Sequence, residues 1–234
     1  MISRLVFVAP KPNMAEADFF RYWKVVHAPL GARIPQVVGY RICCRVPVPG
    51  LPTAGPFLGA AEIWIRDAAA AVAMAQSDEY VTGARADDPH WLAFWAMVVL
   101  DTEAHVLLGD PAPGASPGGV KILALVKRKP GMSVAAFREY SLGRHAELDL
   151  RLPGLRRYVQ GHLPDGWYEV GEPPFDSVAQ LWFDGAAEAA AALESDANRA
   201  AAADLANFVD PLHAIPLAVD ETWVVGPQFR TGAA

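Results

Sequence analysis

Several features of ordinary functional classes are missing from this chain of 234 residues. No apolar run reaches the 18 or so residues of a membrane span, and the apolar part of MISRLVFVAPKP is about five residues, too short for a signal peptide. The formal net charge is −6 and the basic residues form no cluster, so the electrostatic footprint of a nucleic-acid or anionic-membrane partner is absent. We therefore expect a cytoplasmic protein without a nucleic-acid or membrane partner.

Cysteine is nearly absent, and the motifs of common cofactor sites are missing. Cys43 and Cys44 are adjacent, a poor geometry for a mutual disulfide and no metal-ligand spacing, so we expect two buried spectators. The chain contains no GxGxxG, GxxxxGK[ST], GxSxG, HExxH or CxxC. Nucleotide, serine-hydrolase and zinc sites thus lack support, and we predict no metal and no cofactor.

The dominant feature present is an internal repeat. FFRYWKVVHAPLGARIPQVVGYR at residues 19–41 returns as FREYSLGRHAELDLRLPGLRRYV at residues 137–159, at an offset of 118. The same offset pairs Trp64 with Trp182 and Glu103 with Glu221. Because the offset is kept along the whole repeat, we predict two copies of one fold, at residues 1–108 and 119–234. The Pro/Gly/Ser-rich residues 109–118 indicate a flexible linker.

Each copy has the element order βαββαβ. In the first copy, apolar alternation predicts strands near residues 2–9, 37–46, 59–66 and 97–108, and helical spacing predicts helices at 15–28 and 67–80. Pro29 should end the first helix near His27. In the second copy the last strand should begin at Leu217.

A βαββαβ unit is a ferredoxin-like module with helices on one face of an antiparallel sheet. With 53% hydrophobic residues, the chain can bury a sizeable core. We predict an α+β fold in which two such repeats pack sheet to sheet as an intramolecular barrel, with a small-molecule pocket in the interior. The alternative is two independent domains.

His27 is the first candidate for chemistry. It lies near a helix end, five residues after Tyr22, where a neighbouring hydroxyl can bond an imidazole. It is either a general acid or base or a structural histidine, and these interpretations are evenly balanced. His145 and Tyr140 stand at the matching places of copy two.

The surroundings of the two histidines differ. Trp23 is replaced by Ser141, and Arg144 adds a guanidinium next to His145, which would disfavour protonation of that imidazole. The two sites should therefore not be chemically equivalent, and one outcome is that one copy keeps the active pocket while the other has become scaffold. Further candidates for the pocket wall are the aromatic and polar residues Trp23, Tyr40, Glu62, Trp64, Trp91, Trp95, Arg144, Tyr158 and Trp182.

The patterns M-x4-F-x2-YW-x3-HAPL-x4-P and M-x4-F-x2-Y-x4-HAEL-x4-P resemble the EthD family of dimeric α+β-barrel proteins. The segment YWKVVHAPL carries the most specific part of the resemblance, and SLGRHAEL departs from it by lacking the tryptophan and the proline. The resemblance covers both halves and implies a tandem protein that is a pseudo-dimer within one chain, with pairing into a homodimer left open.

The resemblance also implies a range of activities. Relatives are associated with ether-degradation gene clusters, with dehydration, decarboxylation or cyclisation of polyketide-type intermediates, and more distantly with cofactor-free oxygenation or haem chemistry. Our leading hypothesis is a cofactor-independent lyase or cyclase that acts on an aromatic or polyketide-like substrate. In it His27 shuttles a proton, and Tyr22 or Tyr40 donates a hydrogen bond to the developing enolate or phenolate oxygen. The alternatives are a cofactor-free monooxygenase and a non-catalytic protein that binds a hydrophobic metabolite or haem. Neither substrate nor reaction follows from the sequence.

Overall fold

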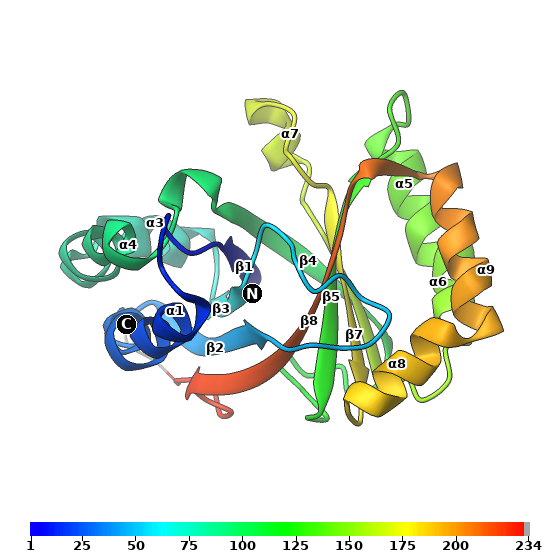
Figure 1. The fold of residues 1–234 in the computed structure, drawn as a ribbon. Coiled ribbons are helices and arrows are strands. Elements are labelled where there is room, and N and C mark those ends of the chain that lie inside the picture. Colours follow the sequence, from blue (N-terminus) through cyan, green and yellow to red (C-terminus); the bar gives the residue numbers. More distant parts are fainter. Residues whose placement is uncertain (232–234) are drawn as a thin grey trace. The chain divides into compact units, whose positions relative to one another are not determined.

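The first repeat has the predicted order of elements in a computed structural model that describes residues 1–231 (Figure 1). Its elements are β1 (Ile2–Val8), α1 (Glu16–Tyr22), η1 (Trp23–His27), α2 (Ala28–Gly31), β2 (Val37–Arg45), β3 (Gly59–Ile65), α3 (Ala68–Gln76), η2 (Glu79–Ala84), α4 (Arg85–Trp91), η3 (Phe94–Ala96) and β4 (Val98–Leu108).

The second repeat follows the same plan, after a segment that holds neither helix nor strand at residues 109–119. Its elements are β5 (Val120–Arg128), α5 (Val134–Tyr140), η4 (Ser141–His145), α6 (Ala146–Asp149), β6 (Arg157–His162), α7 (Gly166–Val170), β7 (Ser177–Phe183), α8 (Ala186–Glu194), α9 (Asp196–Asp204), η5 (Leu205–Asn207) and β8 (Val209–Val225).

The strands hydrogen-bond in the order β1-β3-β2-β8-β5-β7-β6-β4, which closes on itself. This is the strand order of an α+β barrel made from two ferredoxin-like repeats, and it confirms the predicted fold class. By their contacts the residues form two compact units: unit 1 is 1–45, 56–101 and 221 onward, and unit 2 is 46–55 and 102–220. The units therefore differ from the sequence repeats at both last strands and at one loop.

Unit 1 contains an antiparallel sheet with β3 between β1 and β2. Successive side chains of a strand point to opposite faces, so Ala61 and Ile63 share one face of β3, while Glu62 and Trp64 share the other. The first face packs against the helices, where Phe19, Trp23 and Trp91 form an aromatic cluster with ring centroids 4.9 to 5.8 Å apart.

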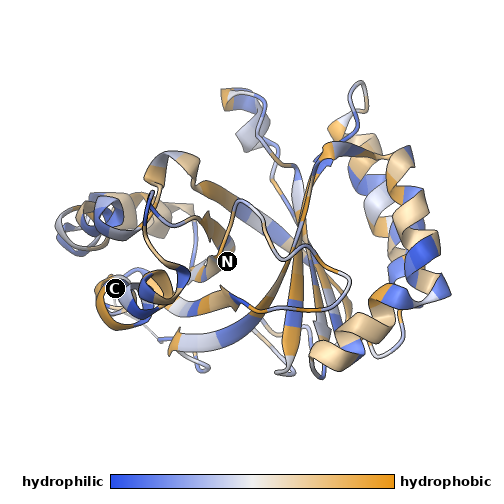
Figure 2. Ribbon diagram, viewed as in Figure 1, coloured by the Kyte–Doolittle hydropathy of each residue, from blue (hydrophilic) through white to orange (hydrophobic). Residues whose placement is uncertain are grey.

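Unit 2 contains the equivalent sheet, with β7 between β5 and β6, and β5 also pairs with β8. The alanine-rich helix α8 colours as hydrophobic over most of its length in Figure 2, and its Ala189 and Ala192 are buried. The loop of residues 46–55, which follows β2, also belongs to this unit. There Val48 is buried and the Val46 N–H donates to the Ala218 carbonyl at 2.9 Å.

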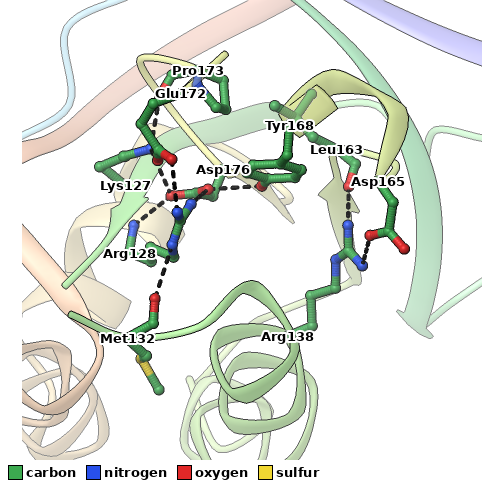
Figure 3. Close-up of polar contacts among 10 residues, drawn as sticks. All are labelled: Lys127, Arg128, Met132, Arg138, Leu163, Asp165, Tyr168, Glu172, Pro173 and Asp176. Carbon is green, nitrogen blue, oxygen red and sulfur yellow. Dashed lines mark hydrogen bonds and ion pairs between the residues drawn. The ribbon is translucent and has the colours of Figure 1, made fainter. Parts of the chain in front are cut away.

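The loop between β6 and β7 is fixed by charged groups of its own unit (Figure 3). Asp176 is buried and receives hydrogen bonds from Arg128 and from the Tyr168 hydroxyl. Glu172 pairs with Lys127 and Arg128. These bonds hold α7 close to β5, so this loop and residues 46–55 have different conformations although they occupy matching places in the two repeats.

The first helix of each repeat contains a π-helical turn and does not stop where the sequence predicted. The α1 helix passes through η1 and continues as α2 to Gly31, so the prediction that Pro29 ends it near His27 is wrong. Pro29 lies directly after the π turn, at the beginning of α2, and the helix continues past it to Gly31. The matching turn η4 leads into α6 in the same way.

The last strand of the second repeat is longer than predicted, because β8 begins at Val209 and not at Leu217. Its first half contains Pro211 and Pro216, and a proline in a sequence segment argues against assigning that segment to a strand. Pro216 nevertheless lies opposite Ala124 in the β5 register.

Replacing Gly59 by alanine should lower the free energy of unfolding by about 2 kcal/mol or more, because overpacking a strand forces the backbone to shift. A Cβ there would lie 2.3 Å from the Cys43 carbonyl oxygen and 2.8 Å from the Trp23 ring. Gly55→Ala is the matched control, since its Cβ would meet nothing within 4 Å. Urea unfolding should show a change within about 0.5 kcal/mol for the control, and equal stabilities would contradict the packing described at β3.

Candidate functional site

In repeat two a single carboxylate holds both the tyrosine and the histidine of the first helix. Asp204, at the end of α9, accepts a hydrogen bond from the Tyr140 hydroxyl at 2.7 Å through Oδ1. Its Oδ2 lies 3.0 Å from Nδ1 of His145. The ring of Phe208 packs against the imidazole, with centroids 4.7 Å apart, so the imidazole is fixed on one edge and one face.

Repeat one contains the same arrangement. Asp87 of α4 accepts from the Tyr22 hydroxyl at 2.6 Å and lies 3.0 Å from Nδ1 of His27. Trp91 packs on the imidazole with ring centroids 4.6 Å apart. The Tyr and His pair that the sequence singled out is therefore brought together in both repeats, by an aspartate that the sequence analysis did not identify.

The π-helical turn makes this arrangement possible. Residues five apart in an α-helix point in directions about 140° different, since each residue turns about 100°. Tyr22 and His27 are five apart, as are Tyr140 and His145, and between them lie η1 and η4. A π turn bonds residues i and i+5, and such turns occur frequently at functional sites. It brings both side chains to one side of the helix, where one carboxylate bonds both.

The electrostatics of these contacts assign the protons. Burial and the bond to Asp87 raise the pKa of Tyr22 to about 12, and burial and Asp204 likewise raise the pKa of Tyr140. Burial alone would raise the pKa of Asp204, but hydrogen bonds from Tyr140, Asn207 and His145 lower it. The tyrosines thus keep their protons, Asp204 is ionised, and Nδ1–H of His145 donates to it, which leaves Nε2 on the other edge of the ring.

The imidazole of His145 lines a cavity of about 330 Å³ in unit 2. The cavity lies between the helices and the sheet face formed by Ile122, Ala124, Ala179 and Leu181. The sequence had placed the pocket in the space between the sheets, and this cavity instead lies on the helix side. The reason is the alternation of the strands, which turns Tyr158 toward the helices and its neighbours Arg157 and Val159 away from them.

One wall of this cavity is polar. It is formed by Ser141, His145, Asp149, Tyr158 and Gln160, and most of the remaining lining is aliphatic, with Phe208 and Phe183. Asp149 Oδ2 accepts from the Tyr158 hydroxyl at 2.7 Å and lies 3.4 Å from His145 Nε2. The Gln160 amide donates to the Tyr158 hydroxyl, and Ser141 Oγ donates to Gln160 Oε1 at 2.8 Å.

The protonation of this wall follows from its burial. Burial raises the pKa of Asp149, although His145 and the bond from Tyr158 act in the opposite direction. Burial and the neighbouring Asp149 raise the pKa of Tyr158 well above its ordinary value. Tyr158 therefore keeps its proton, which it donates to Asp149 Oδ2, and the same oxygen lies 3.4 Å from Nε2 of His145. The histidine thus faces a carboxylate on each of its two nitrogens.

The corresponding cavity of repeat one is smaller, at about 140 Å³. Trp23, Gly31 and Ile42 stand where repeat two has Ser141, Asp149 and Gln160. Trp23 is fully buried, and its Nε1–H donates to the Tyr40 hydroxyl at 3.2 Å. The Tyr40 ring lies 3.1 Å from the point where a Cβ of Gly31 would stand. Aromatic rings therefore fill the space that is open in repeat two, and His27 has no counterpart of Asp149.

The other predicted site residues divide into two sets. The residues that lie at the two cavities are Trp23, His27, Tyr40 and Trp91 in repeat one, and His145 and Tyr158 in repeat two. The remaining wall candidates do not line either cavity. Glu62, Trp64 and Trp182 lie on the opposite face of their strands because side chains alternate, Trp95 is 65% exposed, and the Arg144 side chain is 71% exposed.

Glu62 belongs to a separate buried cluster in unit 1. Arg41 bonds Glu62 at 2.5 Å and Glu221 at 3.1 Å, and its guanidinium lies 5.2 Å from the ring centroid of Trp64 and 4.9 Å from that of Trp223. Ligand atoms of Cys43, Glu62 and Glu221 lie within 4.8 Å of one another. Because Arg41 already supplies the positive charge that these carboxylates need, the cluster gives no support to a metal site.

Asp204, Asp149 and Gln160 were missed for two different reasons. Asp87 and Asp204 are 117 residues apart, so the offset of 118 that relates the rest of the repeat does not pair them. The π turn η2 in repeat one has no equivalent in α9, and such a turn accommodates one extra residue. The offset of 118 does pair Asp149 with Gly31 and Gln160 with Ile42. The replacement of a glycine and an isoleucine by polar residues in the second repeat was therefore visible in the sequence.

The fold and the paired helix motif define the class of α+β barrels that the sequence suggested, and a direct comparison gives the family. The model of the EthD domain matches residues 11–94 and again residues 129–212. The chain belongs to the EthD family, with two domains in tandem. A stretch of 74 residues is 35% identical to an uncharacterized 11.0 kDa protein of the thcB-thcC intergenic region in Rhodococcus erythropolis, covering 32% of this chain and 70% of that protein.

Solved structures share the fold over nearly the whole chain. An anthrone oxidase-like protein matches with a TM-score of 0.64 and 12% identity, over 99% of this chain and 96% of that one. A heme-binding protein from Thermus thermophilus matches with a TM-score of 0.51 and 10% identity, over 94% and 90% of the two chains. At these identities the similarity concerns the fold alone. Within the described residues, no helix has the length and apolarity needed to cross a membrane.

The stability of the protein should fall between about pH 6.5 and pH 4 because of His162. Burial, His105 and Arg138 lower the pKa of this imidazole to about 4, whereas the unfolded chain takes up the proton near pH 6.5. Between these values the unfolded state binds more protons, so the free energy of unfolding decreases as the pH is lowered. The loss amounts to roughly 3 kcal/mol at about 1.4 kcal/mol per pH unit.

Urea unfolding of the wild type and of His162→Gln at pH 7 and pH 4.5 checks this expectation. Gln keeps a donor for Gln160 Oε1, which accepts from His162 at 3.0 Å, but does not titrate. The variant should lose distinctly less stability over this range than the wild type. Parallel losses would show that His162 does not cause the pH dependence.

Proposed function

We propose that this EthD protein is a small-molecule enzyme, most simply a cofactor-independent lyase or cyclase, whose chemistry takes place in the cavity of repeat two. The observation that carries the proposal is the polar wall, where His145 Nε2 lies 3.4 Å from a buried carboxylate and beside a tyrosine that keeps its proton. Acid–base help from a positioned histidine is worth roughly 10²- to 10⁴-fold in rate.

The wall supports a proton transfer with defined roles. His145 Nε2 removes a proton from a carbon next to a substrate carbonyl, while Asp204 holds Nδ1–H and stabilises the imidazolium that forms. The Tyr158 hydroxyl, which donates to Asp149 Oδ2 in the structure, turns to donate to the developing enolate oxygen. In a dehydration the imidazolium then returns its proton to a hydroxyl that leaves from the adjacent carbon, so water is released and His145 is neutral again.

The same base step serves the monooxygenase alternative. There His145 deprotonates an electron-rich phenol or enol, and the anion reacts with dioxygen. The observation that favours this candidate is the fold shared with an anthrone oxidase-like protein. The monooxygenase consumes dioxygen and the lyase does not, so oxygen consumption during turnover separates the two candidates.

The sequence favoured His27, because its segment carries the more specific part of the family pattern. The cavities support His145 instead, since aromatic rings fill repeat one and Asp149, the carboxylate that faces Nε2 of His145, has Gly31 at the matching place of repeat one. We therefore assign the reaction to His145, Asp149 and Tyr158, with Tyr140 and Asp204 as positioning residues. His27 and Tyr22 take a structural role that joins α1 to α4.

Replacing His145 by glutamine should reduce kcat by roughly 10²- to 10⁴-fold, because glutamine cannot transfer a proton. His27→Gln is the matched control and should change kcat less than about threefold. A panel of aromatic β-hydroxyketones and polyphenols supplies the substrates, with mass spectrometry for the loss of water or carbon dioxide and an oxygen electrode in the same reaction.

Equal losses in the two variants would contradict the assignment to repeat two. Full activity of His145→Gln on a substrate that the wild type converts would exclude this histidine as the acid or base. If ligands bind to the wild type and to both variants but no product forms, the protein is a carrier and the enzyme proposal fails.

A further inference from the structure

We propose that the cavity of repeat two selects an uncharged aromatic ligand with one phenolic or ketonic oxygen, and excludes carboxylates. This inference builds on the proposed function because it concerns the same cavity, but it states a binding preference that exists with or without turnover. It rests on the charges around the cavity and on the position of its polar wall.

The cavity lacks a positive charge to receive an anion. Among the described residues that line it there is no lysine or arginine, while Asp149 contributes a carboxylate. Arg144, the residue before His145, has a side chain 71% exposed, and its guanidinium lies over the Tyr140 ring at 5.7 Å. Its charge faces Asp204 at 3.6 Å and is screened by solvent.

The histidine does not supply the missing charge, because two carboxylates already face it. Asp204 lies 3.0 Å from Nδ1 and Asp149 lies 3.4 Å from Nε2. A ligand carboxylate would be a third negative group in a site where burial already raises the pKa of Asp149. Burying a charge without a partner is costly, and like charges repel at short range. The wall therefore disfavours an anionic ligand.

An uncharged oxygen fits the same wall. The Tyr158 hydroxyl donates to Asp149 Oδ2 in the structure and can turn its single proton to a ligand oxygen instead, while both N–H groups of Gln160 stay on the Ser141 carbonyl and the Tyr158 hydroxyl. Asp149 Oδ2, once released from that bond, and His145 Nε2 are acceptors when unprotonated. A phenol donates its proton to one of the acceptors and accepts from Tyr158, and a ketone accepts from Tyr158 alone. Both satisfy the wall without adding a charge.

The rest of the cavity sets the size and polarity of the ligand. Its volume of about 330 Å³ is at the lower end of small-molecule pockets, which suits a fused bicyclic ring. Leu51 and Pro52, from the loop that follows β2 in repeat one, line it together with Leu193 of α8. Gly50 in this loop has a φ of +92° and would place a Cβ 3.4 Å from Leu193, so the loop approaches α8 closely.

A consequence for the reaction follows. Decarboxylation requires a substrate that enters as a carboxylate, so this cavity favours dehydration or cyclisation of an uncharged substrate within the set of lyase reactions. The reaction that supplies such a substrate must leave it without a free acid group on the part that enters the cavity.

The test is a fluorescence titration of the full chain at pH 7 with 2-naphthol and 2-naphthoate, which share a ring system and differ in charge. We expect 2-naphthol to bind at least about tenfold more tightly. Asp149→Asn, which removes one negative charge at nearly constant shape, should strengthen 2-naphthoate binding by about tenfold and change 2-naphthol binding by less. Ala179→Phe, which fills the cavity from β7, should abolish binding, while His27→Gln should leave it unchanged.

Each result decides a separate point. Equal or tighter binding of 2-naphthoate, or no effect of Asp149→Asn on it, would overturn the proposal even if His145 proves to be the catalytic base. Unchanged binding to a cooperatively unfolding Ala179→Phe variant would place the ligand elsewhere and also overturn it. Preferential 2-naphthol binding without turnover of any substrate would support the ligand class while the enzyme proposal failed.

Discussion

One carboxylate in each repeat, half-buried at Asp87 and buried at Asp204, joins the first helix to α4 or α9. Asp204 binds Tyr140 and His145, which lie about 60 residues earlier in the chain, and Asp87 does the same for Tyr22 and His27. Removing the partner of such a charge leaves an unsatisfied group, which costs more than the bond itself contributes. The position of the imidazole, the place of the cavity and the separation between helices and sheet all depend on this link.

Around this common link the two repeats have diverged in opposite directions. Repeat one fills its interior with Trp23, Trp91 and Tyr40, and buried aromatic rings of this size contribute substantially to stability. Repeat two has Ser141, Asp149 and Gln160 at the corresponding wall and keeps an open cavity. An open cavity costs packing energy, and buried polar groups are tolerated only when they are hydrogen-bonded. The well-packed repeat one can offset the packing energy that the open cavity of repeat two costs. A dimer of two identical subunits would have two such cavities and would lose this packing energy in both.

The sequence predicted the fold well because periodicity and an internal offset report on backbone structure directly. The strand runs, the βαββαβ order and the EthD resemblance agree with the structure and the family match. The site was predicted only in part. The sequence suggested that each tyrosine hydroxyl bonds the neighbouring imidazole, whereas both groups bond an aspartate, Asp87 or Asp204, that was not anticipated. The two aspartates correspond only if the π turn η2 of repeat one accommodates one extra residue. A hydrophobic pattern does not reveal such a turn. The sequence placed the pocket between the sheets, whereas the cavity of repeat two lies on the helix side of its sheet. The sequence pattern did not show which strand face carries Tyr158 and which carries Trp182.

The exchange of last strands has a consequence for how the chain acquires its structure during synthesis. Unit 1 needs the residues from Glu221 onward, which are made more than 100 residues after Asp101. Unit 2 needs residues 46–55 from the first repeat and residues 102–220 that follow it. When the first repeat has been synthesised, unit 1 still lacks its last segment, which is made at the end of the second repeat. Both units are completed late and nearly together, so assembly depends on contacts distant in sequence, which slow folding.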